Sequence, residues 1–334
     1  MTGMEITSHK NLMLFSGRAH PALAQAVASR LGVEVVPTSA YDFANGEIFV
    51  RFEESVRGSD AFVIQSHSSP VNTWLMEQLI MVDALKRASA KRITVVAPFY
   101  PYARQDKKHR GREPISARLV ADLFKTAGAD RLMSLDLHTA QIQGFFDGPV
   151  DHLFALSLLA DHVVSKYDPA TVTIVAPDSG RVRVAERWTD RLSAVLRARG
   201  DAGGVPLAFI HKTRDPDRPN QVKANAVVGD VRGRTAVIVD DMIDTAGTVT
   251  KAAELLYEAG ATDVVVTATH GVLSGPAVDR LKNSRITEVV VTDSLPLQPE
   301  MRFPQLTELS IAPVIASAIR EVFQDGSVTS LFDD

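Results

Sequence analysis

The stretch Val237-Ile-Val-Asp-Asp-Met-Ile-Asp-Thr-Ala-Gly-Thr248 joins an apolar run to a pair of aspartates and a loop of small residues. The apolar run at 235–239 has no polar alternation, which is typical of a strand buried on both faces of a parallel sheet. After the aspartates, residues 246–259 carry apolar side chains at three- and four-residue spacing, which predicts a helix. We therefore expect the loop to lie at the carboxyl end of a strand, where open α/β sheets bind their ligands.

The same alternation of apolar runs and helical patterns extends through both halves of the chain. The other predicted strands are 12–15, 61–66, 93–98, 131–136, 172–176, 206–211, 263–267 and 288–292. The other predicted helices are 21–31, 72–88, 115–127, 153–166 and 181–199. The sequence therefore predicts the α/β class with mainly parallel sheets.

Length and an internal similarity both indicate two domains. The chain has 334 residues, whereas a single domain commonly has about 150. The segment AGADRLMSLDLH at 127–138 also aligns with AGATDVVVTATH at 259–270. The strands upstream of these segments lead into different loops, PFYPYARQDKKHRGREP in the first half and DDMIDTAGT in the second. We expect the two halves to differ in function at these two loops.

Composition excludes several classes of protein. Hydrophobic residues make up 45% of the chain and charged residues 23%, which argues against disorder and coiled coil. No apolar run approaches the ~18 residues of a membrane span, and the first residues lack the pattern of a signal peptide, so we expect a cytoplasmic protein without a membrane partner. Cysteine is absent, which excludes disulfides and thiolate sites. The net charge of −4 gives no global attraction for nucleic acid, and we expect none as a partner.

The loop after strand 235–239 has two chemical parts. At the start of a helix, small residues let backbone N–H groups and threonine hydroxyls converge on a phosphate. The residues expected to do so are Asp244, Thr245, Ala246, Gly247 and Thr248. Asp240 and Asp241 are acceptors suited to the vicinal hydroxyls of a sugar. The alternative is that Asp244 is an ordinary N-cap and the acidic pair a solvated turn.

The first-half loop, FYPYARQDKKHRGR at 99–112, combines aromatic residues with clustered positive charge. Such residues can stack on a base while binding polyphosphate, so we expect a nucleotide here. The sequence has no Walker A motif and no GxGxxG, and a nucleotide must therefore be held by another device. The alternative is a solvated basic loop, which is the usual meaning of a short charge run.

The DDMIDTAGT string resembles the phosphoribosyl diphosphate loop of type I phosphoribosyltransferases and of ribose-phosphate diphosphokinases. Further strings separate the two groups: YARQDKK at 102–108, SLDLHTAQIQGFFD at 134–147, MVDALKRASAKRI at 81–93 and NGE at 45–47. In this order, and over nearly the whole chain, they resemble the ribose-phosphate diphosphokinase family, also called phosphoribosyl diphosphate synthetases, in its phosphate-activated class.

The resemblance implies an enzyme of nucleotide biosynthesis that transfers the β,γ-diphosphate of ATP to the C1 hydroxyl of ribose 5-phosphate, with Mg²⁺ as cofactor. It also implies two tandem type I phosphoribosyltransferase-like domains, 1–155 and 156–308, with 309–334 completing the first. The family suggests a homo-oligomer, a hexamer, with phosphate and ADP as effectors.

The resemblance further assigns roles to individual residues. ATP would be bound by Phe43, Asn45 and Glu47, reaching in from a neighbouring subunit, and by Arg104 and Gln105. Without the resemblance, Asn45-Gly46-Glu47 predicts only a tight turn between strands. Ribose 5-phosphate would be bound by Arg214, Asp240, Asp241 and 244–248, and Mg²⁺ by His138 and Asp178. The regulatory positions would be Ser55, Arg57, Ser89 and Ser310. This chain departs from many relatives at Asn45, where they have Asp, and at Arg181, where they have Gly.

Lys212 and Arg214 match the family's catalytic pair. They follow strand 206–211 and open a polar stretch with two prolines and no helical periodicity, which predicts a mobile loop. Two cations on such a loop can meet the charge that spreads over a diphosphate during transfer. An exposed surface loop is the alternative.

Two rival functions remain from the sequence. A type I phosphoribosyltransferase would share the DDMIDTAGT loop but has no reason to carry a second domain with a basic loop of the ATP type. A non-catalytic regulatory homologue would show damage in the phosphate loop or around Lys212, and both strings are intact.

Overall fold

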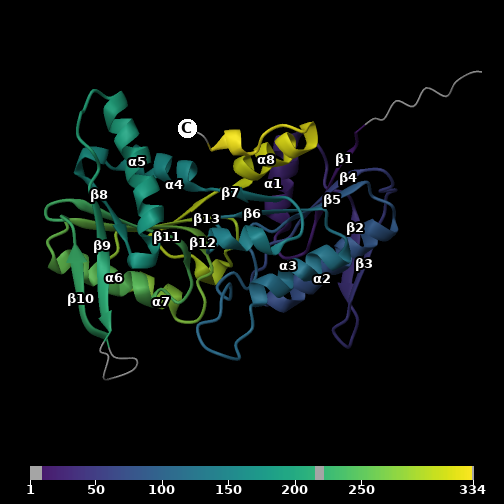
Figure 1. Cartoon of the computed structure of the whole chain (residues 1–334), viewed down its shortest axis with the longest axis horizontal. Coiled ribbons are helices and arrows are strands. Elements are labelled where there is room, and N and C mark those ends of the chain that lie inside the picture. Colours follow the sequence, from purple (N-terminus) through teal and green to yellow (C-terminus); the bar gives the residue numbers. More distant parts are fainter. Residues whose placement is uncertain (1–9, 215–221, 333–334) are drawn as a thin grey trace, which may run out of the picture. The chain divides into compact units, whose positions relative to one another are not determined.

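The computed structural model describes residues 10–214 and 222–332 of an α/β protein, with the side chains of 212–214 and 222–225 left out (Figure 1). The chain divides into two compact units, Met1–Phe154 with Ala312–Asp334, and Ala155–Ile311. Each unit is built on its own sheet, and nearly all strand pairs are parallel. The predicted fold class is therefore confirmed.

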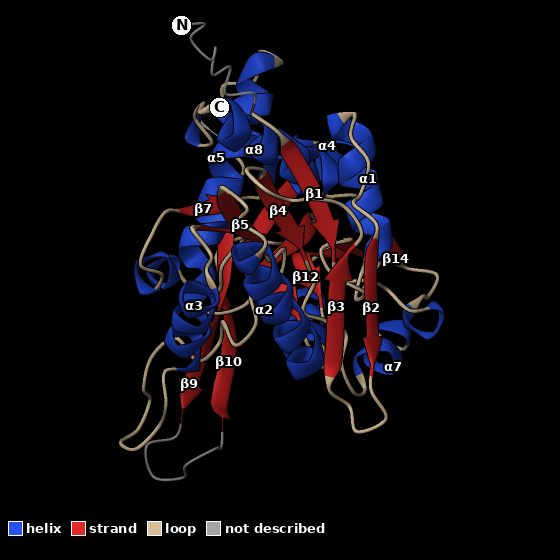
Figure 2. Cartoon of the chain, turned by 90° about the vertical axis from the view of Figure 1, so that its right-hand side faces the viewer, coloured by secondary structure: helices blue, strands red, loops and turns tan. Residues whose placement is uncertain are grey.

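Unit 1 contains a five-stranded parallel sheet in the order β1-β4-β5-β6-β7. Its strands are β1 (Leu12–Ser16), β4 (Asp60–Ile64), β5 (Arg92–Val96), β6 (Arg131–Leu135) and β7 (Val150–Leu153). Its helices are α1 (Pro21–Leu31), α2 (Val71–Arg87), α3 (Ser116–Ala127) and α8 (Ala312–Gln324), with a 3-10 helix at Ala140–Phe145. The strands β2 (Thr38–Asp42) and β3 (Ile48–Phe52) form a separate antiparallel hairpin (Figure 2).

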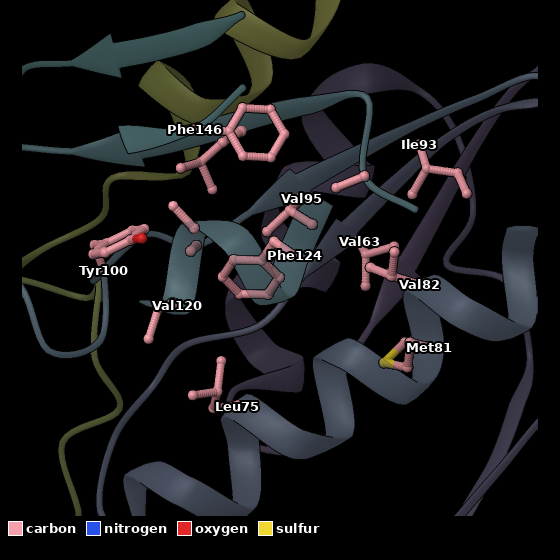
Figure 3. Packing of buried hydrophobic residues seen from close by; sticks show 14 of the residues in the cluster. Val63, Leu75, Met81, Val82, Ile93, Val95, Tyr100, Val120, Phe124 and Phe146 are labelled. Atoms are coloured by element: carbon pink, nitrogen blue, oxygen red, sulfur yellow. The ribbon is translucent and has the colours of Figure 1, made fainter. Parts of the chain in front are cut away.

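The core of unit 1 follows from the spacing of its apolar residues. Helix α3 buries Ala117, Val120, Ala121 and Phe124, which recur every three or four residues and therefore share one face. Phe124 lies in one cluster with side chains of β4, β5 and α2, among them Val63, Val95 and Met81 (Figure 3). Every residue of β4 is buried, as a strand covered on both faces requires.

Unit 2 contains a seven-stranded sheet in the order β10-β9-β8-β11-β12-β13-β14. Its strands are β8 (Val172–Ala176), β9 (Leu207–Arg214), β10 (Val222–Val228), β11 (Thr235–Ile243), β12 (Asp263–Gly271), β13 (Glu288–Thr292) and β14 (Leu306–Leu309). Its helices are α4 (Leu156–Lys166), α5 (Val182–Ala198), α6 (Gly247–Glu258) and α7 (Ala277–Lys282). Short 3-10 turns lie at Pro169–Thr171, Ser179–Arg181 and Pro299–Met301.

The region after His211 differs from the sequence prediction. A loop was expected to begin there, but β9 continues to Arg214 and pairs antiparallel with β10, with Lys212 opposite Asn225 and Arg214 opposite Val222. The expectation of a loop at these two residues is wrong because a pairing partner farther along the chain extends the strand. Residues 215–221 lie outside the described part.

Other differences concern short or peripheral elements. The turn between strands that the sequence predicts at 45–47 is the tip of the β2–β3 hairpin, although the bounds of these strands were not predicted. The sequence did not predict β7, β10, β14, α7 or α8. The two strands of the hairpin are exposed or half-buried, so they lack the apolar run by which the central strands were found. Within residues 10–214 and 222–332, no helix combines the length and the apolar character needed to cross a membrane.

Candidate active site

The acidic pair lies in the carboxyl-terminal part of β11. Asp240 is half-buried and Asp241 is buried, although aspartate is seldom buried without a partner. The backbone N–H of Asp241 donates a hydrogen bond to Asp240 Oδ1 at 2.9 Å, which fixes the Asp240 carboxylate against the backbone of the next residue. The alternative of a solvated turn is therefore wrong.

Arg181 bridges the two carboxylates. Its Nε lies 2.9 Å from Asp240 Oδ1, and one of its terminal nitrogens donates to Asp241 Oδ1 at 2.6 Å. Burial raises the pKa of Asp240 well above its usual range, the Asp241 carboxylate raises it further, and the Arg181 guanidinium opposes both. Arg181 was not assigned a role from the sequence, where the only signal was its replacement of the glycine found in many relatives.

The loop between β11 and α6 turns sharply before the helix begins. Ala246 precedes Gly247, the first residue of α6, and has a left-handed backbone with φ of +59°. No side chain caps this helix at its N-cap position, so the alternative that Asp244 is an ordinary N-cap is wrong. Asp244 instead accepts a hydrogen bond from the hydroxyl of Ser274, and its backbone carbonyl accepts one from Ser274 N–H at 3.0 Å.

Arg280 of α7 supports the same loop from its other side. It donates from Nη1 to the carbonyl of Thr245 at 2.9 Å. A Cβ atom added at Gly247 would lie 3.2 Å from this Nη1, closer than ordinary contact. The loop 244–248 is therefore held by contacts from 273–280 while its backbone N–H groups stand at the start of a helix, an arrangement that suits a phosphate.

The two residues expected to bind a metal follow strands, as the sequence predicted, but they belong to different units. In unit 1, His138 is half-buried after β6. In unit 2, Asp178 is half-buried after β8, and its Oδ1 accepts a hydrogen bond from Gly180 N–H at 2.9 Å. The described residues contain no group of three or more His, Asp or Glu side chains that could form a metal cage by themselves.

The loop after β5 in unit 1 presents its charges but hides one of its aromatic rings. Tyr100 is only 1% exposed and donates to the carbonyl of Ala117 at 2.8 Å, so it cannot stack on a base. Arg104 and Gln105 are exposed. Asp106 is buried and accepts hydrogen bonds from Thr139 at 2.7 Å and Gln141 at 2.6 Å, which ties the loop to the segment after His138.

The remaining basic residues of this loop surround a small acidic anchor. Lys107, Lys108, Arg110 and Arg112 are all exposed. The Glu113 carboxylate accepts hydrogen bonds from the backbone N–H groups of Arg110 and His109, and these bonds lower the pKa of Glu113. The loop is therefore shaped by its own backbone contacts while its cations face outward.

The hairpin of β2 and β3 carries the predicted residues Phe43, Asn45 and Glu47 at its exposed tip (Figure 2). The tip is closed by a hydrogen bond from Phe43 N–H to the carbonyl of Glu47 at 2.7 Å. Asn45 Oδ1 accepts from Glu47 N–H at 3.2 Å, so part of its role is to shape the turn. The Phe43 ring lies against the rings of Tyr41 and Phe49 and is 47% exposed, and Asn45 and Glu47 are exposed as well, so all three remain accessible to a ligand or another chain.

Among the predicted regulatory residues, the structure brings together two segments of unit 1. Gly58 N–H donates to the carbonyl of Ser89 at 2.9 Å, which joins the turn containing Ser55 and Arg57 to the end of α2. All three side chains are exposed. Ser310 is exposed as well but belongs to unit 2.

Comparison with protein-family models gives two matches. The N-terminal domain of ribose phosphate pyrophosphokinase matches residues 12–128. The phosphoribosyl synthetase-associated domain matches residues 211–333. Together the two matches include the hairpin, the basic loop, Lys212, Arg214 and the acidic loop.

Curated relatives match over nearly the full length. A ribose-phosphate pyrophosphokinase of Streptomyces avermitilis is 66% identical over 334 residues, which are 100% of this chain and 100% of that protein. One of Mycobacterium tuberculosis is 65% identical over 326 residues, which are 98% of this chain and 97% of that protein.

A solved structure has the same fold. The crystal structure of phosphoribosylpyrophosphate synthetase from Mycobacterium smegmatis matches with a TM-score of 0.88 and 63% identity. The match covers 95% of this chain and 100% of that chain.

Proposed function

The chain belongs to the ribose-phosphate pyrophosphokinase family, and from that premise we propose how its two units share the reaction. The enzyme transfers the β,γ-diphosphate of ATP to the C1 hydroxyl of ribose 5-phosphate, giving 5-phosphoribosyl 1-diphosphate and AMP for nucleotide biosynthesis. The observation that carries this function is about two-thirds identity over the whole chain, basic and acidic loops included.

We propose that unit 2 binds ribose 5-phosphate. Its phosphate would lie against the backbone N–H groups of 244–248, where the start of α6 favours an anion. Its vicinal hydroxyls would donate hydrogen bonds to Asp240 and Asp241, because ionised carboxylates are acceptors only. The supporting contacts are those of Arg181, Ser274 and Arg280, which hold these groups in place.

ATP is assigned to unit 1. Arg104 and Gln105 would contact the nucleotide from the exposed loop after β5, and the neighbouring cations would meet its polyphosphate. Phe43, Asn45 and Glu47 would hold the adenine of ATP on a neighbouring subunit, since the hairpin tip is exposed in its own chain. A site completed by a second copy requires a homo-oligomer, and we propose a hexamer.

We propose Mg²⁺ as the cofactor, with His138 and Asp178 as its protein ligands. Mg²⁺ prefers oxygen ligands, retains waters and is commonly bound by one or two carboxylates together with substrate phosphates. The sparse donor set of the described residues fits an ion of this kind better than a closed protein cage. When bound, Mg²⁺ would neutralise part of the phosphate charge.

Transfer requires no nucleophile from the protein. The C1 hydroxyl oxygen of the sugar forms a bond to the β-phosphorus, the bond between this phosphorus and the α–β bridging oxygen breaks, and AMP leaves with that oxygen. The hydroxyl gives up its proton in the process. Lys212 and Arg214, which lie on β9, are assigned to stabilise the charge that spreads over the transferred diphosphate. Arg214 is also assigned to the sugar phosphate.

For regulation, we propose that phosphate activates and ADP inhibits at a site that includes Ser55, Arg57, Ser89 and Ser310. The adjacency of the first three within unit 1 supports a shared site, and Arg57 supplies a cation for an anion. A cytoplasmic location remains a prediction from the sequence.

The function is tested by following AMP. Purified protein incubated with Mg²⁺ and ATP is expected to form AMP only when ribose 5-phosphate is added, in equal amount with phosphoribosyl diphosphate. AMP formation that does not depend on the sugar phosphate would contradict the proposal.

A further inference from the structure

We propose that Arg181 is a positioning residue of the sugar site, which holds Asp240 and Asp241 at a fixed separation for the hydroxyls of ribose 5-phosphate. The proposal rests on the proposed role of this acidic pair.

The first argument is the geometry of the guanidinium. Two nitrogens of one planar group contact two different carboxylates, at 2.9 Å to Asp240 and 2.6 Å to Asp241. The planar fork of an arginine keeps its nitrogens at a set distance, so it also fixes the distance between the two oxygens that it contacts. A ligand with two adjacent hydroxyls needs this kind of fixed spacing between acceptors.

The second argument is charge. Arg181, Asp240 and Asp241 have side chains only 14%, 16% and 6% exposed, so water screens their charges poorly. Two carboxylates so close to each other favour sharing a proton. Burial and the neighbouring carboxylate both raise the pKa of Asp240, and the Arg181 charge opposes them together with the hydrogen bond from Asp241 N–H. Without the guanidinium, the pair would more readily hold a proton and lose an acceptor.

Arg181 leaves acceptor capacity for a sugar. The ion pairs of Arg181 with Asp240 and with Asp241 are each made to Oδ1 of the aspartate. An ionised carboxylate offers about four acceptor sites on its two oxygens. A diol can therefore bind while the arginine stays in place, so Arg181 does not have to be displaced by the substrate.

The backbone places Arg181 for this purpose. It is the last residue of the 3-10 turn Ser179–Arg181, which follows β8, the neighbour of β11 in the sheet. Its N–H donates to the carbonyl of Asp178 at 3.2 Å, and α5 begins at the next residue. The side chain therefore extends from a fixed turn toward the adjacent strand.

The test compares Arg181→Met with Arg181→Lys by steady-state kinetics at saturating ATP. Methionine keeps much of the length but removes the charge and the fork. Loss of charge-assisted hydrogen bonds of this kind is worth about 1.5–3 kcal/mol, so the KM for ribose 5-phosphate should rise roughly 10- to 150-fold. The KM for ATP and kcat should stay within a factor of about three, since the hydroxyls are bound alike in ground state and transition state. Lysine should restore part of the loss, because it supplies charge without the fork.

Matched controls separate this inference from its premise. Arg197→Met removes an exposed arginine near the other end of α5 and should leave both KM values unchanged. Asp240→Asn tests the acidic pair itself. If Asp240→Asn leaves the ribose 5-phosphate KM unaltered, the proposed sugar site is wrong.

If Asp240→Asn raises that KM but Arg181→Met does not, only the role of Arg181 is overturned. Equal losses for both substrates in Arg181→Met, with normal parameters in Arg181→Lys and an unchanged thermal unfolding curve, would also contradict the proposal. If the methionine variant fails to fold, the lysine variant still decides, because the fork argument requires its sugar KM to lie above that of the parent.

Discussion

The loops after β5 and β11 occupy equivalent positions at the carboxyl ends of central strands, but they are built in opposite ways. The first is long, exposed and basic, and is fixed through the buried Asp106. The second is short and acidic, and it enters a helix within a few residues. A polyphosphate needs cations that can follow several charged groups, whereas a sugar phosphate needs one anion site next to fixed acceptors. Under the proposed function, one strand-and-loop plan would serve two ligands through the chemistry of the loop.

The largest change in activity is expected from removing Lys212 and Arg214, two cations that belong to neither loop. Lys212→Ala and Arg214→Ala should each lower kcat roughly 10²- to 10³-fold, because such donors act chiefly on charge that develops in the transition state. The double variant should lose less than the product of the two single effects. Steady-state kinetics with both substrates gives the kcat of the parent, the two single variants and the double variant.

A nearly normal kcat for Lys212→Ala would contradict the proposed catalytic role of Lys212. Binding of Mg²⁺-ATP and the unfolding curve serve as controls, since the variants should retain both.

The next largest effects should differ between the two loops, because a substitution in each loop is expected to weaken the binding of a different substrate. Gly247→Val places a branched side chain where a Cβ would already lie 3.2 Å from Arg280 Nη1, beside the proposed phosphate site. Arg280 or the loop backbone must shift to admit this side chain, so ribose 5-phosphate binding should weaken much more than ATP binding. Arg104→Ala should instead weaken ATP binding.

The control for Gly247→Val is Gly144→Val in unit 1, where a Cβ would meet nothing within 4 Å. If Gly247→Val weakens both substrates equally, the division of the two ligands between the loops is not supported.

A smaller effect concerns the effector site in unit 1. Activity should rise as inorganic phosphate is titrated at fixed free Mg²⁺, and Arg57→Ala should shift the rise to higher phosphate, because it removes an exposed cation beside Ser89. A flat curve for the parent would show that phosphate does not activate this enzyme.

The smallest expected effect is on stability, and it concerns Glu288 at the start of β13 in unit 2. Burial alone would raise the pKa of Glu288, but hydrogen bonds from four groups, led by Lys166 and Thr307, outweigh it and lower the pKa to about 2. A carboxyl group with a lowered pKa stabilises the fold above its unfolded value of 4.5, and this contribution is lost as the pH falls toward 2.

Glu288→Gln should therefore be less stable than the parent at pH 6, and the difference should shrink between pH 4.5 and pH 2. Urea unfolding across this range gives the free energies. A difference that is the same at every pH would mean that packing, not charge, accounts for the effect.

The central strands and the motif loops could be predicted from the sequence because local patterns encode them. Strands β4 and β11 each contain a continuous apolar run, AFVI at 61–64 and AVIV at 236–239, and α3 repeats its apolar residues at helical spacing. The acidic loop was also found at the expected end of its strand. The position of this loop needed only the rule that ligand sites follow strands.

What the sequence could not predict depends on contacts between distant segments. The extension of β9 through Lys212 comes from β10, which lies beyond residues 215–221. The burial of Tyr100 depends on α3, because the carbonyl of Ala117 in that helix accepts a hydrogen bond from the Tyr100 hydroxyl. The bridge from Arg181 to the acidic pair joins residues about sixty positions apart. In each case the residue type allowed two environments, and the tertiary fold selected one.

The most direct test of the central claim follows the label from ATP carrying ³²P at the β-phosphorus. Diphosphoryl transfer between the two proposed sites predicts that the label appears in phosphoribosyl diphosphate while AMP remains unlabelled. Labelled ADP together with a sugar that has gained a single unlabelled phosphate would show transfer of the γ-phosphoryl group alone, and it would contradict the account.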